Sequence, residues 1–373
     1  MFMDISSELI HSLLPVFMAS VLGAPMATIG LIEGAGEAAA AITKIFSGAI
    51  SDHLGKRKLL AGLGYGIAAL TKPIFPLAAS ISWVFGARFI DRVGKGIRGA
   101  PRDALVADMS PRELRGASFG LRQSLDTVGA FVGPLAAMVF MVLFANDIRA
   151  VLWVAVPPAL IAVVVLIFGV YEPKRPTGKI RQASLLNFAG TGQLPLRYWI
   201  IVVLGAIFSL ARFSEAFLVL RAENVGLAVG YVPLVLIIMN VFYTATAYPA
   251  GVAADKRSQR WFLVGGLAML VSADLALALA TSPLLAFIGA ALWGVHMGLT
   301  QGLFAKLVAD TALTALRGTA FGIFNLVSGL SLLLASFIAG ELWQAFGARA
   351  AFLSGAGFAM FALLGLLICR RSP

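Results

Sequence analysis

Residues 105–120 read LVADMSPRELRGASFG, and residues 307–322 read LVADTALTALRGTAFG. Nine of the sixteen positions are identical without a gap, at an offset of 202 residues. Internal similarity at an offset of about half the length of a 373-residue chain indicates two copies of one structural unit. The repeat therefore predicts two halves that share one topology.

The composition places this repeat in a membrane. The chain is 60% hydrophobic and 13% charged, with a mean hydropathy of +0.91, whereas soluble domains are about 45–50% apolar and about 25% charged. A net charge of +11 would suggest nucleic-acid binding in a soluble protein, but in a membrane protein basic residues mark cytoplasmic loops. The single Cys369 excludes an internal disulfide and a cysteine metal cluster. We expect no cofactor, no metal site and no nucleic-acid partner.

Twelve apolar segments are each long enough to cross the hydrocarbon core as a helix. The predicted spans are 2–22, 28–51, 59–79, 81–99, 117–145, 150–171, 198–222, 229–252, 259–280, 283–308, 318–339 and 347–369. The predicted fold is thus an all-α membrane protein with twelve transmembrane helices in two six-helix pseudo-symmetric bundles.

A polar stretch with two prolines and a glycine separates the bundles, and these residues discourage a continuous helix. The expected domains are an N-terminal bundle over 1–171, a cytoplasmic linker over 172–197 and a C-terminal bundle over 198–373.

Lysines and arginines concentrate in the even-numbered connections and in the C-terminal tail, which predicts that both termini are cytoplasmic. In this prediction Lys95, Arg98 and Arg102 belong to the connection after the fourth span. The first span begins abruptly at Met1, so we expect that the native chain starts earlier.

The stretch GAISDHLGKRKLL, residues 48–60, is similar to the G-x-x-x-D-x-x-G-[RK]-[RK] signature of the major facilitator superfamily. It lies between the second and third predicted spans, as the signature does in that family. The second half keeps Gly251 and Asp255 at an offset of 203 but has Ser258 at the second glycine position. The resemblance implies two halves related by an axis along the membrane normal, and a transporter that moves small molecules.

The resemblance also implies a cytoplasmic gate. In the family, the acid of the signature faces a neighbouring helix N-terminus, which favours a carboxylate, together with nearby arginines. The implied gate residues are Gly48, Asp52, Gly55, Arg57, Arg115, Asp255 and Arg317. The alternative is a solvated loop that only sets the topology.

A second resemblance lies on the fifth span. The stretch GAFVGPLAA, residues 129–137, is similar to the G-x-x-x-G-P element that is associated with proton-coupled antiporters of the superfamily. Gly129, Gly133 and Pro134 match, whereas alanines replace the later glycines. The element favours efflux in exchange for protons.

The halves differ most in charge, since Arg122 corresponds to Phe324 and Asp126 to Ser328. Charges at bilayer depth are costly and normally face a bundle interior or an aqueous cavity. In the resembled family, spans 1, 2, 4 and 5 and their C-terminal counterparts line the pathway. The predicted proton-coupling and substrate residues are Glu8, Glu33, Glu37, Arg88, Asp91, Arg92, Arg122, Asp126, Arg212, Glu215, His296 and Asn325.

These residues also allow structural interpretations. Arg122 and Asp126 are one helical turn apart and can pair. The charges of the fourth span, which this prediction places towards the cytoplasmic end, can form an ion-pair network that locks it to the fifth. The polar residues of the C-terminal half can serve as contacts between helices. Asp274 on the ninth span is expected at the membrane interface.

The sequence predicts a secondary active transporter that works by alternating access, with proton-coupled efflux of a small organic molecule as the leading hypothesis. One alternative is proton-coupled uptake of an anionic metabolite. Another is a receptor or assembly factor that transports nothing. We expect a monomer in a bacterial inner membrane, whose partners are the substrate, protons and the lipid bilayer. An enzyme is not expected, because the sequence contains no H-E-x-x-H, P-loop or G-x-S-x-G pattern.

Overall fold

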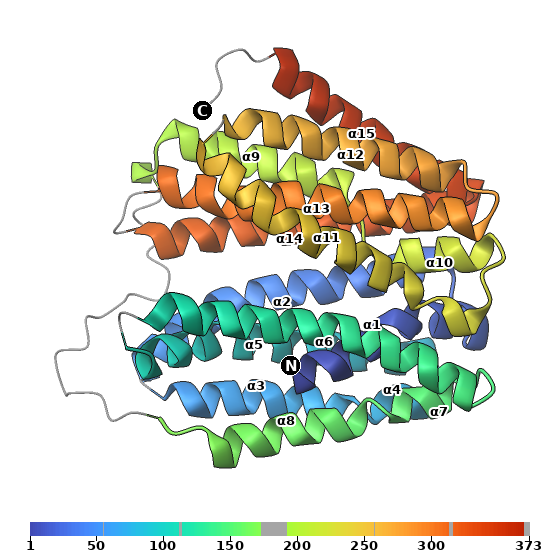
Figure 1. Cartoon of the computed structure of the whole chain (residues 1–373), viewed down its shortest axis with the longest axis horizontal. Helices are drawn as coiled ribbons and strands as arrows, with labels where there is room; N and C mark the ends of the chain where they lie inside the picture. The colour runs from blue at the N-terminus through green and yellow to red at the C-terminus, as the bar shows by residue number, and fades with distance from the viewer. Residues whose placement is uncertain (55, 112–113, 173–191, 257, 313–315, 369–373) are drawn as a thin grey trace. The chain divides into compact units, whose positions relative to one another are not determined.

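The computed structural model describes residues 1–54, 56–111, 114–172, 192–256, 258–312 and 316–368 (Figure 1). Every regular element in these residues is a helix. Most of the predicted linker lies outside the described residues.

The helices correspond one after another to the predicted spans. In the first half they are α1 (Phe2–Val16) with the π-helical turn η1 (Phe17–Val21), α2 (Met26–Leu54), α3 (Arg57–Thr71) with α4 (Ile74–Leu77), α5 (Ile81–Met109), α6 (Arg115–Leu143), and α7 (Ile148–Trp153) with α8 (Val156–Gly169). In the second half they are α9 (Leu196–Ala211) with α10 (Ala216–Asn224), η4 (Val229–Tyr231) with α11 (Leu234–Lys256), α12 (Gln259–Ala278), α13 (Pro283–Thr311), α14 (Arg317–Phe346) and α15 (Ala348–Ile368).

Ten segments of the described chain are long and apolar enough to cross a membrane by length and composition alone. The two predicted spans that do not meet this standard are α2 and α5, because both carry charged residues along their length. Each has 29 residues, which is about 43 Å of helix and more than a hydrocarbon core requires. The predicted all-α membrane fold is confirmed, and the polarity of these two helices becomes the main clue to function.

The length of α5 corrects the predicted connection after the fourth span. Lys95, Arg98 and Arg102 lie on the helix, which continues to Met109. It ends before Pro111, because a proline disfavours helical geometry at the residue that precedes it. The prediction assigned these three basic residues to a loop because cytoplasmic loops of membrane proteins are normally rich in lysine and arginine. The charges of α5 from Arg88 to Arg102 therefore occupy the middle of a 29-residue helix, seven residues or more from either end.

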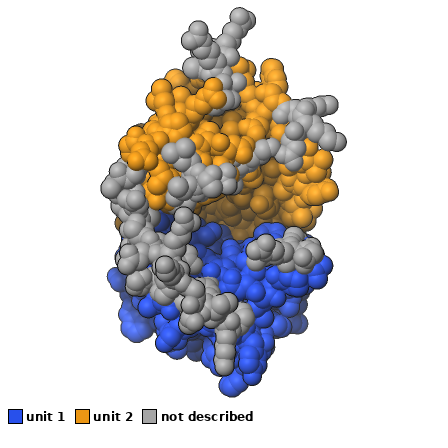
Figure 2. Space-filling model, turned by 90° about the vertical axis from the view of Figure 1, so that its left-hand side faces the viewer, with its two compact units in different colours: residues 1–11, 35–188 blue, residues 12–34, 189–373 orange. Residues whose placement is uncertain are grey.

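The described chain forms two compact units (Figure 2). Unit 1 contains residues 1–11 and 35–188, and unit 2 contains residues 12–34 and 189–373. In unit 1, α3 packs against α5 and α8, and α4 packs against α7. In unit 2, α13 packs against α11 and α12, while α15 packs against α9, α12 and α14. The predicted domain boundaries at 172 and 197 stay a prediction.

Residues 12–34 belong to unit 2 because small residues allow close helix contacts there. A Cβ atom on Gly34 would lie 2.8 Å from the Cα of Leu333, and one on Gly340 would lie 2.8 Å from the Cα of Ala27. The amide of Ala27 also donates a hydrogen bond to Gln344. These contacts join the first half of α2 to α14 within unit 2.

Asp274 on α12 is fully buried, and this corrects the predicted interfacial position. A Cβ atom on Gly355 of α15 would lie 2.6 Å from an Oδ atom of Asp274. The glycine leaves room for the carboxyl group where the two helices cross. The pattern of apolar residues along α12 does not show which face meets α15, so the sequence could not place this acid.

Candidate functional site

Seven partly exposed charged residues of unit 1 form what we term the charged face: Glu8, Glu37, Lys95, Arg102, Asp103, Arg122 and Asp126. They come from α1, α2, α5 and α6. The side chains of Glu37 and Asp103 are 33% and 34% exposed. Because charges within spans face water or protein and avoid lipid, this face is expected to line an aqueous pathway.

The basic residues of α5 share one stripe of the helix. Arg88, Arg92, Lys95, Arg98 and Arg102 follow one another at intervals of three or four residues, which places them above one another on a helix. Arg88, Arg92 and Arg98 are buried, whereas Lys95 is exposed. The stripe therefore contributes both to the interior of unit 1 and to its charged face.

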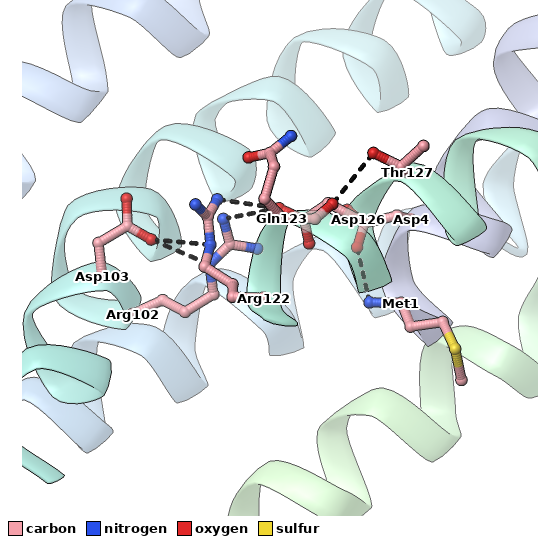
Figure 3. A network of polar contacts seen from close by, with 8 residues as sticks. All are labelled: Met1, Asp4, Arg102, Asp103, Arg122, Gln123, Asp126 and Thr127. Atoms are coloured by element: carbon pink, nitrogen blue, oxygen red, sulfur yellow. Dashed lines mark hydrogen bonds and ion pairs between the residues drawn. The ribbon is translucent and has the colours of Figure 1, made fainter. Parts of the chain in front are cut away.

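Two arginines and two aspartates join α5 to α6 in a ring of ion pairs (Figure 3). The guanidinium groups of Arg102 and Arg122 lie between the carboxylates of Asp103 and Asp126 (Figure 3). Asp126 is 2.9 Å from Arg122 and 3.4 Å from Arg102, and Asp103 is 3.1 Å from Arg122 and 3.4 Å from Arg102. The predicted Arg122–Asp126 pair is present. The parts of Arg102 and Asp103 in this ring were not predicted, because the fourth span was expected to end before them.

A second ion pair joins α2 to α5. An Oε atom of Glu37 lies 3.0 Å from the guanidinium of Arg92, whose side chain is only 4% exposed. A Cβ atom on Gly36 would lie 3.1 Å from the Cγ of Arg92, so the glycine allows the arginine to lie along α2. The pair thus has a buried cation and a carboxylate that water can reach.

The G-x-x-x-G-P element is the site where α6 crosses α1. A Cβ atom on Gly129 would lie 2.7 Å from the Cβ of Asp4, and one on Gly133 would lie 2.8 Å from the Cβ of Glu8. Glu8 in turn lies 3.5 Å from the Nδ1 atom of His11 on the same helix. The glycines therefore bring the acids of α1 next to α6, as small residues do where membrane helices approach closely.

Replacing Gly133 by leucine is expected to destabilise this crossing by about 1–3 kcal/mol or more, because the added side chain would overlap the backbone of α1. Thermal unfolding of the purified protein in detergent measures the effect. Gly120→Leu on the same helix is the control, since a Cβ atom there meets nothing within 4 Å. Equal unfolding midpoints for the two variants would contradict the close crossing.

A further ion pair is enclosed within unit 1. The Nζ atom of Lys72 lies 2.8 Å from Asp91, and the two side chains are 1% and 4% exposed. Lys72 also donates a hydrogen bond to the hydroxyl of Ser7. The pair ties α5 to the end of α3 and to α1. Lys72 was missed in the sequence, although a lysine within an apolar span is itself a signal of a buried partner.

The remaining predicted pathway residues lie in unit 2. Glu33 is 1% exposed. Arg212 and Glu215 flank the break between α9 and α10, at positions predicted to be helical. His296 is buried, and its Nδ1 atom lies 2.8 Å from the carbonyl oxygen of Gly266 on α12, while Asn325 is half-buried on α14. Their roles in transport stay predictions.

Two hollows lie within unit 2. A cavity of about 150 Å³ between α11 and α13 is lined in part by Tyr243 and Gly302, and Tyr243 donates a hydrogen bond to Gln301 at 3.3 Å. A groove of about 870 Å³ between α9 and α15 has apolar walls apart from Arg260. Neither hollow gathers several charges. Among the described residues, no group of three or more histidine, cysteine and acidic side chains could hold a metal ion.

The described part of the predicted gate centres on Arg57. Its guanidinium lies 2.7 Å from Asp108, the aspartate of the first repeat copy, and donates a hydrogen bond to the carbonyl oxygen of Ala104. Its backbone amide donates to Glu172. Gly48 lies against Ala100 of α5. Gly55 and the side chains of Asp52, Arg115, Asp255 and Arg317 lie outside the described residues, so the gate stays a prediction.

Comparisons with known proteins agree with this arrangement. The family model for the Major Facilitator Superfamily matches residues 1–221 and 201–373. An MFS-type transporter of Methanocaldococcus jannaschii is 32% identical over 349 residues, which is 91% of this chain and 85% of the relative. The quinolone resistance protein NorA of Staphylococcus aureus is 27% identical over 126 residues, which is 34% of this chain and 32% of the relative. A crystal structure of a variant of the nucleoside transporter NupG has a TM-score of 0.82 at 14% identity and covers 99% of each chain.

Proposed function

Since the chain belongs to the major facilitator superfamily of membrane transporters, we propose that it exports a small organic molecule in exchange for protons. The two halves alternate in exposing a central site to either side of the membrane. The observation that carries the proposal is the charged face, where carboxylates within the spans pair with basic side chains and remain partly open to water.

In each of these ion pairs the carboxylate can bind a proton, and its charge interaction with the basic side chain is then lost. When Asp126 binds a proton, Arg102 and Arg122 keep only one carboxylate between them, and their mutual repulsion loosens the contact between α5 and α6. When Glu37 binds a proton, its ion pair with the buried Arg92 is lost, and the positive charge of the guanidinium attracts an electron-rich group of the substrate. Proton binding and substrate binding are thereby linked, as coupling requires.

Two sequence features favour export. The G-x-x-x-G-P element on α6 resembles the element of proton-coupled antiporters, and it lies at the crossing that brings Glu8 next to α6. Part of the chain is similar to a protein named for quinolone resistance. Both favour an exporter over an importer, and the direction of proton movement tests this choice.

Replacing Asp126 by asparagine is expected to lower the proton movement that accompanies transport at least about tenfold. The neutral amide cannot bind and release the proton, and a lost charge pair is worth about 1.4 kcal/mol or more. The assay uses proteoliposomes loaded with a pH-sensitive dye, with a substrate first identified by thermal shift from a metabolite and drug panel.

Asp147→Asn is the matched control. Asp147 caps the N-terminus of α7 outside the charged face, and asparagine caps a helix about equally well. The control should behave as the unmodified protein. If Asp126→Asn kept full proton-driven exchange, Asp126 would have no part in coupling.

A further inference from the structure

Lys95 occupies the centre of α5. It lies fourteen residues from Ile81 and fourteen from Met109, or about 21 Å from either end of the helix. Its side chain is exposed on unit 1. A lysine at this depth is expensive unless it meets water or an anion, and transporters of this architecture bind their substrates near the middle of the membrane.

The acids nearest to Lys95 are engaged with other groups. Glu37 pairs with Arg92, and Glu8 pairs with His11. No hydrogen bond or ion pair joins Lys95 to any described residue. Its ammonium group therefore keeps three donors for a group that comes from outside the protein.

A second lysine lies close to the same place. The stem of Lys44 on α2 passes Gly99, since a Cβ atom there would lie 3.7 Å from the Cε of Lys44. Gly99 is one turn beyond Lys95 on the same face of α5. Lys44 is exposed and likewise has no ion-pair partner among the described residues. Two neighbouring ammonium groups that make no direct ion pair with a described carboxylate repel a cationic ligand and attract an anionic one.

We propose that Lys95 binds an anionic group of the transported molecule, a carboxylate or a phosphate, with Lys44 as a supporting charge. This inference rests on the proposed function and names the substrate class of its site. A lysine suits this task because its ammonium is a compact charge on a flexible stem, and it can follow the ligand. Binding supplies charge-assisted hydrogen bonds to an ammonium group that no described residue engages directly.

Binding to the full-length protein in nanodiscs tests the inference without any transport. The probes are matched pairs of succinate with succinamide, benzoate with benzamide, and a sugar phosphate with its parent sugar. We expect at least one anion to bind and its neutral counterpart to bind at least about tenfold more weakly. Lys95→Ala should weaken the anion about tenfold or more, and Lys95→Arg should retain it within a few-fold. Lys58→Ala is the control, because Lys58 donates to the carbonyl oxygen of Ile167 at an exposed edge of α3.

Chemical labelling gives a second, independent measurement. A water-soluble amine-reactive ester should modify Lys95, and the bound anion should protect it while Lys58 stays reactive. The inference is overturned if a ligand with no anionic group binds equally well to the unmodified protein and to Lys95→Ala. It is also overturned if anions bind without protecting Lys95. Binding with protection but without proton movement in liposomes would contradict the proposed function and leave this inference standing.

Discussion

Replacing Lys72 by methionine is expected to lower the free energy of unfolding by about 3–5 kcal/mol, since it leaves the buried carboxylate of Asp91 without its cation. The midpoint of thermal unfolding in detergent should fall by about 5–10 °C. Asp91→Leu should have a similar effect, because it strands the ammonium group of Lys72 instead.

The double variant Lys72→Met with Asp91→Leu distinguishes a structural pair from a transport site. Replacing both members of a buried pair by apolar residues is often neutral, so the double variant should recover most of the lost stability. Lys58→Met at the exposed edge of α3 should change the midpoint little. If the double variant were as unstable as either single variant, the pair would not be the source of the loss.

Replacing Glu37 by glutamine is expected to reduce pH-driven transport about a hundredfold. The variant removes the proton-binding group and also breaks the ion pair of the buried Arg92 with Glu37, and such changes typically cost about 2–5 kcal/mol. Substrate binding should also lose most of its dependence on pH, because the amide does not titrate. Transport is measured in proteoliposomes with an imposed pH gradient.

Glu341→Gln is the control for this variant, as Glu341 is an exposed residue near the end of α14. It should leave both transport and the pH profile unchanged. A Glu37→Gln protein that still accumulated substrate against its gradient in response to pH would show that the coupling acid lies elsewhere.

The spans followed from composition because the membrane requires long apolar helices. The exceptions are informative. Lys95, Arg98 and Arg102 were assigned to a loop, since the prediction treated basic residues as markers of topology, whereas all three lie on α5. The two repeat copies coincide with the boundaries between these helices. In both halves LVAD lies near the end of one helix, and RG begins the next helix.

The ion-pair partners within unit 1 could not be predicted with the same success. Arg122 and Asp126 lie on one helix, so their spacing alone predicted the pair. The partners of Asp91 and Arg92 lie on other helices, and helix rotation is not fixed by periodicity when a span has charges on more than one face. Lys95 was assigned to a loop for the same reason as Arg98 and Arg102.

The central claim is that substrate and protons move in opposite directions, and the most direct test is the lumenal pH of proteoliposomes when substrate is added outside. No pH gradient is imposed, and the membrane potential is clamped. We expect the lumen to become alkaline as substrate enters and protons leave, and the response should vanish in Glu37→Gln. A lumen that became acidic would mean that substrate and protons move together, and an unchanged pH during substrate uptake would mean that they are not coupled; either result would contradict the account.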